Sequence, residues 1–144
     1  MLRGSSPAKV DDKGRLKIPA LFKGYVQETY GREFFVTSYN GEFVRLYPMA
    51  AWIEIEKKLI GNSSLRPELA RFRNSVNYFG QPATMDDQGR VLIHPLLRQK
   101  SGTVGDVLVI GGLTYLDIWN REKFEGQGVH ASDDDLRVVS EYGI

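Results

Sequence analysis

Two short segments combine an aspartate, a glycine and an arginine at the same spacing. An aspartate in a tight turn accepts hydrogen bonds from backbone N–H groups, and a glycine there adopts a positive φ without strain. Arginine carries a planar cation that can pair with a phosphate or with the O6 and N7 atoms of guanine. The residues are Asp11, Gly14 and Arg15 in the first segment, and Asp86, Gly89 and Arg90 in the second. The pattern predicts two tight turns, each followed by an arginine that can bind nucleic acid.

Other basic residues surround the first turn. The net charge of the chain is only +1, but residues 1–24 carry six basic and two acidic side chains. Residues 120–144 carry three basic and six acidic side chains. A basic front and an acidic back can orient a protein on a polyanion. The predicted DNA contacts are Arg15, Lys13, Lys17, Lys9, Arg3 and Arg90.

Plainer explanations of these charges stay open. Arg15 can simply form a salt bridge with Asp11 across the turn, and an exposed pair of that kind contributes only about 0–1 kcal/mol. A chance distribution of surface charges explains the uneven charge equally well. Lys23 is a weaker candidate for DNA contact, and a position at an exposed helix end explains it equally well. The second turn has fewer basic neighbours than the first. We therefore expect the first copy to be the stronger DNA contact.

The remaining reactive residue types form no catalytic or metal-binding set. The chain has no cysteine, and its two histidines are His94 and His130. An isolated histidine is more often structural or solvated than catalytic. The aspartates at 133–135 suit the first turn of a helix, where the dipole favours negative charge, and no phosphate-loop motif surrounds Gly111 and Gly112. We expect a non-enzymatic protein with no cofactor, metal or small-molecule substrate.

The two turns belong to a longer internal repeat. Residues 11–18 (DDKGRLKI) match residues 86–93 (DDQGRVLI), and residues 43–47 (FVRLY) match residues 115–119 (YLDIW) at nearly the same offset. Each copy is predicted to contain a turn, a strand, a loop, a β-hairpin and a helix. One copy has too few strands to bury both faces of its hairpin, and unpaired strand edges invite further chains. The two copies must therefore pack on each other.

Local signals define the individual elements and the units. Strand signals at 34–39 and 42–47 flank Asn40-Gly41, and those at 107–110 and 114–119 flank Gly111-Gly112, so each pair is predicted to form a hairpin. Apolar periodicity predicts helices at 48–60, at 67–79 and after Ser132. The predicted loops are 61–66 and 125–130. The predicted units are 1–79, with two helices at its end, and 80–144, with the C-terminal helices, within one shared folding unit.

The doubled motif, the hairpins and the helices between the copies resemble the MraZ family. These are bacterial transcriptional regulators built from two AbrB-like (SpoVT-AbrB) units with paired Asp-x-x-x-Arg motifs, and the resemblance runs from about Arg3 to Phe124. It implies a mainly β fold with short helices (α+β), in which the duplicated units form a swapped-hairpin, double-psi-like β-barrel and the chains a ring-shaped homo-oligomer. It also implies that Asp11 and Asp86 brace their loops, while Arg15 and Arg90 face DNA.

The resemblance implies a function as well. It is sequence-specific binding to direct repeats in promoter DNA, with repression of the protein's own division and cell-wall gene cluster from the cytoplasm, in association with the nucleoid. Two positions depart from the doubled pattern, because His94 matches Pro19 and Leu92 matches Lys17. An alternative is a ring-forming, antitoxin-like module that binds another protein. The sequence shows no signal peptide and no apolar run near the ~20 residues of a membrane span, so we expect no membrane association.

Overall fold

Eight strands within residues 1–62 and 66–144, which the computed structural model describes, form one antiparallel sheet. Their order is β5-β3-β4-β8-β7-β1-β2-β6. The strands are β1 (Ser5–Val10), β2 (Arg15–Lys17), β3 (Glu33–Thr37), β4 (Val44–Pro48), β5 (Gln81–Thr84), β6 (Arg90–Leu92), β7 (Gly105–Gly111) and β8 (Leu116–Asn120). The helices are α1 (Ala20–Tyr30), α2 (Met49–Asn62), α3 (Pro67–Phe79), α4 (Pro95–Ser101), α5 (Arg121–Gly126) and α6 (Asp133–Ser140).

The internal repeat interleaves its two copies in this sheet. Strands β1 to β4 repeat as β5 to β8, and β1 pairs with β7 just as β3 pairs with β5. Strand β2 pairs with its own counterpart β6, and β4 with its counterpart β8. The outer strands β5 and β6 meet where the N–H of Asp86 donates to the carbonyl of Arg90 at 2.9 Å. The sheet is therefore a nearly closed barrel, and the predicted β-barrel with short helices is confirmed.

The barrel interior is filled by apolar side chains at alternating positions of most strands, together with side chains from α1 and α4. Leu16 and Ile18 point inward, whereas Lys17 is exposed, so the predicted alternation after the first turn is confirmed. Strand β6 repeats this arrangement with Val91 and Ile93. The largest fully buried side chains of this core include Phe22, Phe34, Leu46, Met85, Leu97, Leu116 and Ile118.

The prediction of a loop between the first strand and the hairpin of each copy is wrong. Helix α1 occupies that position in the first copy, and the shorter α4 occupies it in the second. Helix α1 buries Phe22 and Val26, four residues apart, while Leu21 and Tyr25 stay exposed. Apolar residues at 21, 22, 25 and 26 do not by themselves define one buried face, so only burial in the barrel reveals this helix.

The prediction of a tight, two-residue hairpin turn at Asn40-Gly41 is also wrong. Strand β3 ends at Thr37 and β4 begins at Val44, so residues 38–43 form the connection. The side chain of Asn40 accepts a hydrogen bond from the N–H of Glu42 at 2.9 Å, and the Ser38 hydroxyl accepts one from Gly41 at 2.9 Å. These side-chain bonds replace the strand pairing that a two-residue turn would require. In the second hairpin, residues 112–115 join β7 to β8, again a longer connection than predicted.

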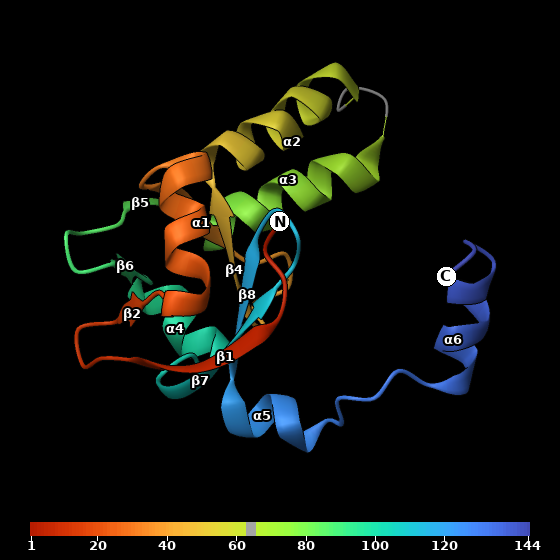
Figure 1. Ribbon diagram of the computed structural model, residues 1–144. Coiled ribbons are helices and arrows are strands. Elements are labelled where there is room, and N and C mark those ends of the chain that lie inside the picture. The colour runs from red at the N-terminus through yellow and green to blue at the C-terminus, as the bar shows by residue number, and fades with distance from the viewer. Residues whose placement is uncertain (63–65) are drawn as a thin grey trace.

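The predicted helices between the units and at the C-terminus are confirmed. Helices α2 and α3 form a hairpin on the outer face of the barrel, where Phe35, Tyr47, Trp52 and Val76 make a second apolar cluster. Of the loop predicted at 61–66, residues 61 and 62 extend α2, and residues 63–65 lie outside the described residues. Helix α5 takes up part of the loop predicted at 125–130. Helix α6 stands away from the barrel (Figure 1). In the described part of the chain, no helix combines the length and apolar character needed to cross a membrane.

Candidate nucleic-acid interface

Asp11 organises the loop between β1 and β2. Its Oδ1 accepts hydrogen bonds from the N–H groups of Lys13 at 3.0 Å and Arg15 at 2.9 Å. Its Oδ2 accepts a third bond from Nε of Arg15 at 2.8 Å. Gly14 closes the turn with φ at +84°, and its N–H donates to the carbonyl of Asp11 at 2.9 Å. One carboxylate thus holds both the backbone and the side chain of the arginine.

The second copy repeats this geometry between β5 and β6. Asp86 accepts from the N–H groups of Gln88 and Arg90, each at 2.9 Å, and from Nε of Arg90 at 2.9 Å. Gly89 has φ at +77° and donates its N–H to the carbonyl of Asp86 at 3.0 Å. The two loops are equivalent down to individual hydrogen bonds.

These hydrogen bonds set the ionisation of both aspartates. The backbone N–H of Arg15 is the largest influence that lowers the pKa of Asp11, and the backbone N–H of Arg90 does the same for Asp86. Donors aimed at a carboxylate favour its charged form. Both loops therefore keep an ionised aspartate well below neutral pH.

The pairing of β2 with β6 brings the two loops side by side. The N–H of Ile18 donates to the carbonyl of Gly89 at 2.9 Å, and the N–H of Ile93 donates to the carbonyl of Gly14 at 2.8 Å. Residues directly opposite in an antiparallel pair project from the same face. The outward pairs are Arg15 opposite Leu92 and Lys17 opposite Arg90, so the two arginines lie on a diagonal of one surface.

We call the surface formed by Lys13, Arg15, Lys17 and Arg90 the basic ridge. Lys13 and Lys17 are exposed, while the side chains of Arg15 and Arg90 are 30% and 28% exposed. Within the described residues, Nε is the only side-chain nitrogen of either arginine that is hydrogen bonded. The terminal nitrogens stay available to an external acceptor, while the rest of each side chain is held in place.

The two remaining predicted contacts lie off the basic ridge. Lys9 is exposed on β1, opposite Asp106 of β7, with 3.8 Å between its Nζ and the carboxylate. Arg3 precedes β1, whereas Asp11 follows it, so roughly 20 Å of extended strand separates Arg3 from the turn. The structure groups Lys13, Arg15, Lys17 and Arg90, and leaves Arg3 at the other end of the strand.

Two cations from the helices reach the loops of the opposite copy. Lys23 of α1 packs over Gly89, where an added Cβ would lie 2.9 Å from its Cε. Arg98 of α4 packs over Gly14 in the same way, and its Nε is buried with no hydrogen-bond partner among the described residues. Each follows the motif arginine of its own copy by eight positions. That shared offset is the sequence signal for the pair, and Arg98 was missed as a site residue.

Comparison with known proteins agrees with the doubled motif. The family model described as "MraZ protein, putative antitoxin-like" matches residues 1–74 and 81–140. Two relatives called transcriptional regulator MraZ, from Acidobacterium capsulatum and Koribacter versatilis, are 40% and 43% identical over the full length of both chains. A third of that name, from Syntrophobacter fumaroxidans, is 33% identical over 97% of this chain and 92% of its own. This chain belongs to the MraZ family.

Proposed function

We propose that this protein is a transcriptional regulator that binds double-stranded DNA through the basic ridge. The observation that carries the proposal is the diagonal placement of Arg15 and Arg90 on one surface. Each arginine is anchored through Nε, and its terminal nitrogens donate no hydrogen bond to any described residue. Prior anchoring reduces the side-chain entropy lost when an arginine binds. The names of the relatives describe regulators, which supports a non-enzymatic role.

The finer proposal is repression of its own division and cell-wall gene cluster through short direct repeats in promoter DNA. One basic ridge offers few phosphate contacts, so a single subunit would bind weakly. A ring-shaped homo-oligomer that engages several repeats together gains effective concentration instead. Such a protein would act in the cytoplasm, in association with the nucleoid.

Binding across a salt series tests the role of Arg15. Each neutralised phosphate steepens the slope of log affinity against log salt by roughly 0.9. We expect Arg15→Ala to weaken binding to the upstream DNA in a gel shift and to flatten that slope. Arg121→Ala is the matched control, because Arg121 is exposed on α5 and paired with Glu125 at 2.9 Å. Unchanged affinity and slope for Arg15→Ala would remove this arginine from the interface.

A second candidate is a ring-forming module that binds another protein. The words "antitoxin-like" in the family description favour it. Pull-down from a lysate treated with nuclease separates the two functions, because a protein partner survives that treatment and a DNA-bridged one does not. Release of every partner by nuclease supports the DNA-binding role.

A further inference from the structure

Helix α6 has an apolar side that is not packed against the barrel. Leu136 and Val139 lie one helical turn apart and are 55% and 36% exposed. Val138, and Tyr142 just beyond the end of α6, extend the same side, and they are 54% and 76% exposed. Residues three and four positions apart share one face of a helix. The helix therefore presents a continuous apolar stripe to solvent.

Acidic residues border this side of α6, and the start of the helix is capped. Asp133 lies three positions before Leu136, and Asp134 lies four positions before Val138, so both border the apolar stripe. Asp134 also pairs with Arg137 at 2.8 Å. The hydroxyl of Ser132 accepts the N–H of Asp135 at 3.0 Å, and the carboxylate of Asp135 accepts the N–H of Ser132 at 2.9 Å. This capping box stabilises the helix through its own residues. Helix α6 is thus a preformed, amphipathic and acidic element.

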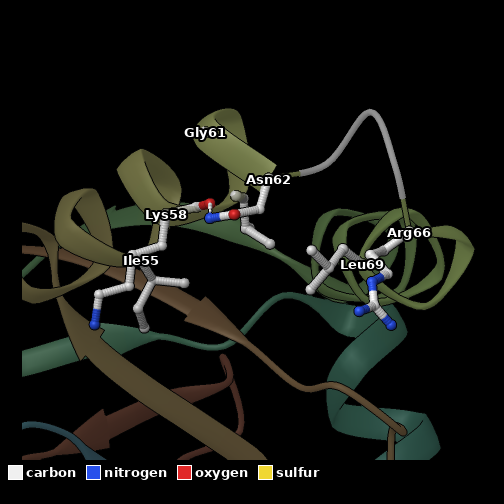
Figure 2. Close-up of a pocket in the computed structure, with 7 residues that line it drawn as sticks. Ile55, Lys58, Gly61, Asn62, Arg66 and Leu69 are labelled. Carbon is white, nitrogen blue, oxygen red and sulfur yellow. Dashed lines mark hydrogen bonds between the residues drawn. The ribbon is translucent and has the colours of Figure 1, made fainter.

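The helical hairpin of α2 and α3 carries a complementary groove. The groove has a volume of about 360 Å³, and Ile55, Leu59 and Leu69 provide its apolar lining. Lys58 and Arg66 add positive charge on its two sides. Figure 2 shows Lys58 on α2, and Arg66 and Leu69 at the beginning of α3 across the groove. An apolar lining with cationic edges matches an apolar helix with acidic edges.

We propose that α6 of one copy of this chain docks into the α2–α3 groove of a second copy. Within one chain, residues 127–132 join α6 to α5 and span at most roughly 20 Å. Helix α5 and the connected ends of α2 and α3 lie at opposite ends of the molecule in Figure 1. A groove from a second copy can lie next to α6 whatever the reach of residues 127–132.

Such docking is head-to-tail, because the helix and the groove are different surfaces of the same chain. A head-to-tail contact closes into a ring when its rotation permits and otherwise forms an open chain. The inference rests on the homo-oligomer in the proposed function and names the surfaces that assemble it. The basic ridge is not one of them, so every subunit keeps its ridge open to DNA.

Disulfide trapping tests the contact directly, because the chain contains no cysteine. Val139→Cys in one preparation and Leu69→Cys in a second, longer tagged preparation are mixed and oxidised. We expect a disulfide-linked heterodimer on a non-reducing gel. Arg137→Cys mixed with Leu69→Cys is the matched control, since Arg137 lies on the polar side of α6, and it should give little of that product. The absence of a selective heterodimer would overturn the proposal. A single chain that carries both Val139→Cys and Leu69→Cys and forms the disulfide only within itself would overturn it as well.

Two further variants separate assembly from folding and from DNA binding. Leu136→Gln with Val139→Gln should lower the molar mass in light scattering, whereas Arg137→Gln with Ser140→Gln should leave it unchanged. Equal masses for both pairs would contradict the proposal. If trapping fails while the wild-type chain still shifts DNA in an Arg15-dependent way, only the docking is wrong. If the wild-type chain does not shift DNA, the DNA-binding function fails whatever the trapping shows.

Discussion

Asp11 and Asp86 each fix an arginine in space before any ligand arrives. The carboxylate binds two backbone N–H groups and the Nε of the arginine, so the loop and the side chain are held by the same group. The salt-bridge explanation of Arg15 and the DNA-contact hypothesis are therefore compatible. The ion pair exists, and it leaves the far edge of the guanidinium available.

Acid should release these loops only at low pH. The folded pKa of Asp11 lies below its ordinary value of 3.8. The loop stabilisation is then present above the unfolded pKa and is lost as the pH falls through the lowered folded pKa. We expect the amide NMR signal of Arg15 to titrate below pH 3.8, and Asp11→Ala to abolish that titration step. A midpoint at or above that value would contradict the bracing role.

Glycine is required at position 14 for two reasons. Its φ is +84°, and an added Cβ would collide with the guanidinium of Arg98. A left-handed conformation costs an L-residue roughly 1–2 kcal/mol. We expect Gly14→Ala to lower the free energy of unfolding in urea by at least about 1 kcal/mol.

Gly24 provides the matched control for Gly14. It lies in α1, and an added Cβ would meet nothing within 4 Å. Gly24→Ala should therefore stabilise by about 0.5–1 kcal/mol. The double variant Gly14→Ala with Arg98→Ala should recover part of the loss, because it removes the collision but not the positive φ. Equal effects at positions 14 and 24 would show that neither reason applies.

At the scale of elements, strand pairing converts the repeat into complementary chemistry. Arg45 of β4 and Asp117 of β8 occupy equivalent positions in the two copies, and they face each other across the β4–β8 pair. Their side chains are only 17% and 19% exposed, with 2.8 Å between Nε and the carboxylate. The guanidinium of Arg45 also lies 3.9 Å from the ring centre of Tyr115. Two identical copies would place like charges at this site.

Removing one member of this pair should be costly. Asp117→Ala leaves Arg45 largely buried without its partner, and losing one side of a buried pair costs about 3 kcal/mol or more. Replacing both, as Arg45→Met with Asp117→Leu, should cost much less, since no unpaired charge remains. Urea unfolding of the two variants measures the difference. Equal destabilisation would show that packing, and not the unpaired charge, dominates.

At the scale of the whole molecule, we propose that units 1–79 and 80–144 fold only together. Strand β2 pairs with β1 of its own unit and with β6 of the other, and β3 pairs with β4 of its own unit and with β5 of the other. We expect residues 1–79 alone to show no cooperative unfolding in circular dichroism. Without β8, strand β4 could pair only with β4 of a second copy, and this pairing would place Arg45 opposite Arg45. Adding residues 80–144 should restore the transition. Cooperative unfolding of the isolated first unit would refute the shared folding unit.

Local chemistry in the sequence was enough to predict the turns, the strand alternation and most of the later helices. Turn residues such as Gly14 act within four positions, and the alternation of Leu16 and Ile18 needs only the period of a strand. Helix α1 escaped prediction because two buried residues, Phe22 and Val26, are too few to define a helical face. The tight turn at Asn40 failed because side-chain hydrogen bonds favoured a longer connection.

By itself, the sequence determined that two equivalent turns exist and that each carries an aspartate, a glycine and an arginine. Only the tertiary structure decided which strands pair between the copies, and hence that Arg15 and Arg90 lie on one diagonal. It also decided that Lys23 and Arg98 reach across to the opposite loop. Turn chemistry depends on neighbouring residues, whereas strand register depends on burying both copies in one barrel. That burial involves residues about 75 positions apart.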